Sequence, residues 1–115
     1  MTTLLVLYRA PEGGEDALRT FEARYRDEHL PLVAETPGLR ATRIWRVGEA
    51  LGGHTDLVMA CAMDFDDRTA LDEGLRSDPM RAAGRILREI APGLATFLVV
   101  EDAPDLLAGK VAGAG

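Results

Sequence analysis

The sequence predicts an α+β protein in which strand-like and helix-like segments alternate along one domain. The chain has 115 residues, of which 47% are hydrophobic and 28% are charged, so it has enough apolar material for one packed core. Short apolar runs typical of strands are separated by segments whose apolar residues recur every three or four positions, as in helices. In order, these segments give strand, helix, strand, strand, helix, strand. This βαββαβ order is typical of a ferredoxin-like fold, an antiparallel four-stranded sheet with two helices on one face.

The first strand and the first helix are separated by a turn. Residues 4–8 form a continuous apolar run, which predicts a buried strand. Residues 11–14 contain a proline and two glycines, and a helix should follow from Glu15 to about Glu28. Pro31 interrupts this helix, because proline disfavours the α conformation of the residue before it. We therefore expect a bend at Leu30 and one further helical turn that ends at Pro37-Gly38.

The second half of the domain contains a hairpin, a helix in two parts and a last strand. Residues 39–47 predict a polar strand at a sheet edge, a Gly-rich connection follows, and residues 56–65 predict a mostly apolar strand. We expect Asp66-Asp67 to cap the next helix. Ser77-Asp78-Pro79 restarts this helix, which runs to about Ile90. Residues 96–100 predict the last strand. The domain should span residues 1–102, and the Ala/Gly-rich residues 103–115 should form a tail that is mobile or acts as an arm.

The predicted strands carry more apolar surface than two helices can cover. Leu4 and Val6 lie on one face of the first strand, and Leu5 and Leu7 lie on the other. An antiparallel sheet with a wet face normally alternates apolar with polar residues, so the second apolar face needs a cover. We expect a homodimer whose sheets pack face to face into a dimeric α/β barrel. Burying a few hundred Å² at ~25 cal/mol per Å² gives on the order of ten kcal/mol before association costs.

Composition excludes several function classes. The net charge of −6 argues against a nucleic-acid partner, because phosphate binding needs a clustered basic surface. No apolar run is long enough for a membrane span or a signal peptide, and the single cysteine, Cys61, cannot form an internal disulfide, which together indicate a cytoplasmic protein. The two histidines, His29 and His54, have no metal-ligand spacing, and no phosphate-binding loop is present. We expect no metal and no organic cofactor, and we expect His54 to be a solvated loop residue.

Residues 21–32 read Phe-Glu-Ala-Arg-Tyr-Arg-Asp-Glu-His-Leu-Pro-Leu, and Pro37-Gly38 follows them. This segment resembles the EthD family of dimeric α/β barrels, which typically shows an aromatic residue, a tyrosine and His-x-Pro-Leu at the end of the first helix, and Pro-Gly before the second strand. The likeness extends over residues 3–101 but is specific only in residues 21–40. It implies a ferredoxin-like dimer that acts without a cofactor as a cyclase, lactone isomerase, decarboxylase or dehydratase (lyase) on a small hydrophobic substrate.

Tyr25 and His29 are the predicted catalytic residues. They are four positions apart and therefore project from one side of the helix. Histidine suits proton transfer because its usual pKa, ~6.5, lets it accept and donate protons near neutrality, and Tyr25 would position or polarise a substrate oxygen. Helix carbonyls favour the charged imidazole and burial favours the neutral one, and the sequence leaves this balance open. The alternative is a structural pair, in which His29 caps the helix and Tyr25 fills the core.

Five further residues are candidates for substrate binding. Arg43 and Trp45 share one face of the second strand, where Trp45 would stack on a flat ligand and Arg43 would balance negative charge, and Phe21 would add an apolar wall. In a lactone-isomerase branch of the family a cysteine joins the histidine, but the matching position falls nearer Met63 than Cys61, so Cys61 is alternatively an inert buried thiol.

Arg81, Arg85 and Arg88 recur at helical spacing and predict an exposed, salt-bridged face. Together these observations favour a cofactor-independent acid–base enzyme that acts on a small hydrophobic, oxygenated substrate such as a polyketide, aromatic or lactone. Two other functions stay open. One is a ligand-binding or accessory barrel without chemistry, and the other is a cofactor-free monooxygenase-like barrel.

Overall fold

A computed structural model describes residues 1–107 of the chain and confirms the predicted order of elements. Its strands are β1 (Thr2–Arg9), β2 (Ala41–Arg46), β3 (Leu57–Phe65) and β4 (Ala95–Glu101). Its helices are α1 (Gly14–Arg24), the π-helix η1 (Tyr25–His29), α2 (Leu30–Ala34), α3 (Arg68–Arg76) and α4 (Asp78–Ile90). Most of the tail predicted from Ala103 lies outside the described residues, and residues 104–107 form one helical turn.

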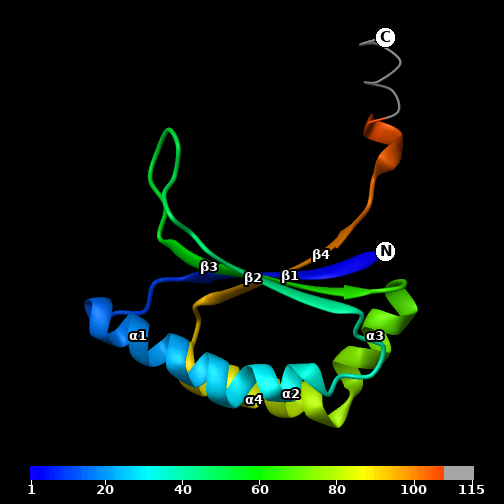
Figure 1. Cartoon of the computed structure of the whole chain (residues 1–115), viewed down its shortest axis with the longest axis horizontal. Helices are drawn as coiled ribbons and strands as arrows, with labels where there is room; N and C mark the ends of the chain where they lie inside the picture. The colour runs from blue at the N-terminus through cyan, green and yellow to red at the C-terminus, as the bar shows by residue number, and fades with distance from the viewer. Residues whose placement is uncertain (108–115) are drawn as a thin grey trace.

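The four strands form one antiparallel sheet in the order β2-β3-β1-β4. The helices from α1 to α4 all lie on one side of it (Figure 1). The hydrophobic core fills the space between the two layers and includes Val6, Phe65 and Leu71, each fully buried. The ferredoxin-like architecture expected from the sequence is therefore present.

The helix before Pro31 does not bend at Leu30, contrary to our expectation. Leu30 keeps right-handed helical angles (φ −61°, ψ −37°), and its N–H bonds to the carbonyl of Tyr25, five residues back. Pro31 then lies in the first turn of α2, where the missing N–H of proline is tolerated. The wide π turn replaces the regular α-helical ladder just before the proline, so the chain continues as helix. The helix ends at Ala34, before the predicted stop at Pro37-Gly38. Gly38 lies in the turn that follows, with a φ of 80° that suits glycine.

The open face of the sheet, opposite the helices, carries many apolar side chains beside a few polar ones. Leu5 and Leu7 point away from the helix layer, since Leu4, Val6 and Tyr8 alternate with them and are buried against it. The pairing of the strands places further apolar side chains beside them, namely Trp45, Ala60, Ala62, Leu98 and Val100. Figure 1 shows the connection between β2 and β3 and residues 102–107 rising at two ends of this face, with no described element across it.

Replacing each of two helical glycines by alanine should change the stability of the protein in opposite directions. A Cβ atom at Gly74 of α3 would lie 2.7 Å from Cε1 of Phe65, so Gly74→Ala should lower the free energy of unfolding by about 1–3 kcal/mol. At Gly84 of α4 a Cβ atom meets only a guanidinium nitrogen of Arg88, at 3.8 Å. Gly84→Ala should therefore raise stability by about 0.5–1 kcal/mol through helix propensity. Urea unfolding of both variants measures the two signs, and equal effects would contradict the packing described here.

Candidate functional site

A cavity of about 750 Å³ opens between the sheet and α4. β1 and β4 form one wall, with Tyr8 and Phe97 among its residues, and α4 forms the other. Phe97 is 57% exposed, because the helices do not reach across the β4 edge of the sheet. His29 lines the cavity from the end of η1. The lining is mainly apolar, which suits a hydrophobic guest.

His29 is held by one ring nitrogen and free at the other. Its Nδ1 lies 2.9 Å from the carbonyl oxygen of Ala83 in α4. Because a carbonyl can only accept, Nδ1 carries the proton and Nε2 carries a lone pair. Nε2 is buried and has no hydrogen-bond partner. This geometry differs from a helix cap, since the imidazole bonds to another helix rather than to the carbonyls of its own.

Burial decides the charge of His29. Loss of solvation lowers the pKa of the imidazole below its usual 6.5, and the Ala83 carbonyl offsets this only in part. The ring of Tyr25 packs on it with a centroid distance of 4.7 Å. His29 is therefore a neutral imidazole at pH 7, with the protonation state of a general base.

The lowered pKa predicts a pH dependence of stability. As the pH falls through 6.5, the unfolded chain takes up a proton at His29 that the folded protein does not bind, so the free energy of unfolding should decrease. His29→Asn should reduce this loss, whereas His54→Asn, in an exposed loop, should keep it. Urea unfolding at pH 7.5 and 5.5 compares the three proteins above the range in which carboxylates titrate. The same loss in His29→Asn as in the wild type would contradict the assignment.

Tyr25 lies behind the cavity rather than in its lining. The hydroxyl of Tyr8 donates to the hydroxyl of Tyr25 across 3.1 Å, and burial raises the pKa of both phenols. Tyr8 does line the cavity. Sequence reasoning missed Tyr8 as a site residue, although it continues the buried face of β1 at the end nearest the first turn.

Cys61 and Met63 point to the same side of β3, but only Met63 lines the cavity. Cys61 is fully buried, and burial raises the pKa of its thiol, an effect that the Tyr25 hydroxyl partly offsets. A thiol held protonated is a poor nucleophile. Phe21 is also buried, packs on Tyr8 and Tyr25, and borders a smaller groove instead of the cavity.

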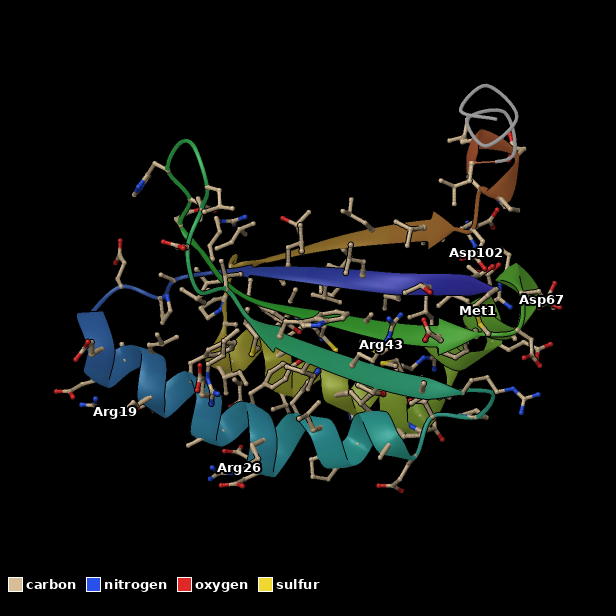
Figure 2. The ribbon with its side chains drawn as sticks, turned by 45° about the horizontal axis from the view of Figure 1, so that its top comes forward. Met1, Arg19, Arg26, Arg43, Asp67 and Asp102 are labelled. Carbon is tan, nitrogen blue, oxygen red and sulfur yellow. The ribbon has the colours of Figure 1, made fainter. Side chains whose placement is uncertain are left out.

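Arg43 and Trp45 do not join the His29 cavity, and this corrects the role expected for them there. They pair with Ala62 and Ala60 and so lie on the open face of the sheet, whereas His29 lies on the helix side. Figure 2 shows Arg43 at the β2 and β3 strands of the sheet, with the labelled Arg19 and Arg26 in the helix layer. The Arg43 guanidinium lies 5.4 Å from the centre of the Trp45 ring and 3.3 Å from the carboxylate of Asp64.

The arginine stripe of α4 also differs from expectation. Arg81, Arg85 and Arg88 are exposed and border the cavity. Within residues 1–107 none of them forms a salt bridge, whereas arginines such as Arg24 and Arg68 pair with carboxylates on their own helices. The predicted salt-bridged face is therefore wrong, and its positive charge is left at the mouth of the cavity.

Two negative findings apply to the described residues. No group of three or more histidine, cysteine, aspartate or glutamate residues is placed to hold a metal ion in residues 1–107. Among the helices in the same range, none has the length and apolar character needed to cross a membrane.

Comparison with solved structures finds several proteins of similar fold. An ethyl tert-butyl ether d (EthD) family protein from Bacillus halodurans superposes with a TM-score of 0.81 and 29% identity, over 90% of this chain and 99% of that chain. The resemblance to the EthD family is therefore confirmed. A dimeric ferredoxin-like protein of unknown function from Bacteroides fragilis matches this chain with a TM-score of 0.64 and 16% identity, over 88% of this chain and 95% of that chain.

An antibiotic biosynthesis monooxygenase has a TM-score of 0.59 and 12% identity over 90% of this chain and all of its own, a likeness of fold alone. No family model and no curated protein matches this chain.

Proposed function

We propose that this EthD-like protein is a cofactor-independent acid–base enzyme that cyclises, isomerises, decarboxylates or dehydrates a small hydrophobic, oxygenated substrate. The observation that carries the proposal is the state of His29, whose Nδ1 is fixed on Ala83 while Nε2 keeps an unpartnered lone pair beside an apolar cavity. A buried polar atom without a partner is costly, which favours a functional reason for it.

In the proposed reaction, Nε2 of His29 removes a proton from a carbon next to a carbonyl group of the substrate. The electron pair moves to the carbonyl oxygen, and the imidazolium then returns the proton at another carbon or to a leaving oxygen. The Ala83 carbonyl stabilises the imidazolium through Nδ1–H, since its contact raises the pKa of His29 against the effect of burial. The proton count balances without any co-reactant.

Tyr8 and Tyr25 have separate roles in this proposal. Tyr8 lines the cavity, and its hydroxyl can turn from Tyr25 to donate to the developing negative oxygen. Tyr25 is a positioning residue, because its ring packs against the imidazole. Two flexible methionines in the lining, Met63 and Met80, can shift to let a ligand approach Nε2.

We also propose that the protein acts as a homodimer in the cytoplasm, joined through the open faces of two sheets. Leu98 and Val100 on that face are 41% and 39% exposed in the single chain. A sheet face with this much exposed apolar surface needs a cover, and the similar protein from Bacteroides fragilis is described as dimeric. The cytoplasm suits a chain whose one cysteine is unpaired.

Deuterium exchange tests the proposed chemistry on a range of compounds of the proposed substrate class. The purified protein is incubated in D₂O with a panel of β-keto lactones, aryl ketones and short polyketide analogues, and mass spectrometry measures deuterium at carbons next to carbonyl groups. Catalysed exchange or conversion of at least one compound is expected. Tight binding of panel members without exchange or conversion would instead indicate the ligand-binding barrel.

A further inference from the structure

We infer that the ligand of the His29 cavity is an anionic amphiphile, with an apolar body against the sheet and a carboxylate or phosphate group at Arg81, Arg85 and Arg88. This inference rests on the proposed function, since it takes the same cavity as the ligand site. It adds the charge of the ligand and the residues that recognise it.

The first observation is that these arginines lack partners in an acidic protein. The chain has 19 acidic residues and 13 basic ones. In the described residues, the other arginines are mostly paired with carboxylates: Arg19, Arg24, Arg26, Arg40, Arg43, Arg46 and Arg68. The arginines of the α4 stripe form no salt bridge or side-chain hydrogen bond there, and Glu89, their neighbour on α4, borders the groove that contains Arg24 instead. Three arginines without a salt bridge therefore line one cavity.

Gly84 gives the second observation. It lies in the interior of α4, between Arg81 and Arg88, and also lines the cavity. Its φ is not in the left-handed region, and an added Cβ atom would have only Arg88 within 4 Å. Neither backbone conformation nor packing requires glycine here, although glycine costs a helix about 1 kcal/mol. Its effect is to keep space open between the arginine side chains.

The third observation is the division of the cavity by chemistry. Leu4, Val6, Met63 and Phe97 make the sheet wall apolar, whereas the positive charge is confined to the α4 rim. Guanidinium groups bind carboxylates and phosphates through paired N–H donors. A ligand bound by its anionic end at this rim presents its apolar body to the sheet and to His29, which fixes its orientation for proton transfer.

Competition binding with matched probes tests the inference. N-phenyl-1-naphthylamine, a neutral dye that fluoresces in apolar sites, is bound to the full-length protein and displaced by 1-naphthoate, 1-naphthamide or 1-naphthyl phosphate. At low salt one of the two anions should displace the dye at least ten-fold more effectively than the amide, and which one does so distinguishes a carboxylate from a phosphate ligand. In 0.5 M NaCl this preference should shrink, because salt screens exposed charges.

Three variants separate the rim from the rest of the protein. The double variant Arg81→Gln/Arg88→Gln should lose most of the preference for the anion while still binding the dye. Arg76→Gln is the matched control, since Arg76 is exposed, forms no salt bridge in residues 1–107 and does not line the cavity. Gly84→Leu should weaken binding of the dye and of all competitors by filling the cavity.

The possible results discriminate between the two proposals. If the amide competes as well as both anions, or if Arg76→Gln loses the preference as the double variant does, the anionic ligand is excluded while the proposed function stands. If the wild type binds neither the dye nor any naphthyl compound, or if Gly84→Leu binds them as well as the wild type, the cavity is not the ligand site. Both proposals then fail.

Discussion

His29→Asn should lower proton-transfer activity by about 10²–10⁴-fold, the usual contribution of a positioned general base. Asparagine can place an N–H group near the position of Nδ1, so it can keep the hydrogen bond to the Ala83 carbonyl. It has no atom equivalent to the free Nε2. The variant therefore separates the structural contact from the chemical one. The measurement is the initial rate of deuterium incorporation into the best compound of the panel, for wild type and variant.

His54→Asn is the matched control for this prediction. His54 lies in the exposed connection between β2 and β3, away from the cavity lining, and its replacement should leave the exchange rate unchanged. Circular dichroism and the melting temperature check that His29→Asn is folded. A folded His29→Asn protein with wild-type exchange would remove His29 from the chemistry and leave it as a link between η1 and α4.

The element order was predictable because each segment carries a strong local signal. Strand-like apolar runs and the Asp67 and Ser77 caps act within a few residues, and the structure keeps each of them, with Asp67 accepting from the N–H of Ala70 at 2.8 Å. Pro37-Gly38 forms the turn after the helix, which already ends at Ala34. The π turn before Pro31 was not predictable in the same way. Rules for proline compare the α conformation with extended ones, and a wide helical turn is a rarer third solution.

The composition of the site was harder to predict than the fold, because it depends on long-range pairing. β2 is exposed along its whole length, so its pattern does not show which face carries Arg43 and Trp45; the register with β3 decides it. The arginine stripe of α4 shows that Arg81 and Arg88 share a face. Whether that face meets solvent or a cavity depends on how far α4 stops short of β4, which no local pattern encodes.

Leu98→Asp should dissociate the proposed homodimer, whereas Val99→Asp should not. These two neighbours are a matched pair, because each is 41% exposed in the single chain and successive strand residues point to opposite faces. Leu98 pairs with Leu5 on the open face, and Val99 pairs with Leu4 on the helix side. In Leu98→Asp, a two-fold interface would bury one introduced carboxylate from each subunit at about 3 kcal/mol each, which weakens association by roughly 10⁴-fold.

Sedimentation equilibrium at micromolar concentration should give a dimeric wild type, a dimeric Val99→Asp and a monomeric Leu98→Asp. A monomeric wild type, or equal dissociation of both variants, would show that the apolar sheet face is not where two copies meet.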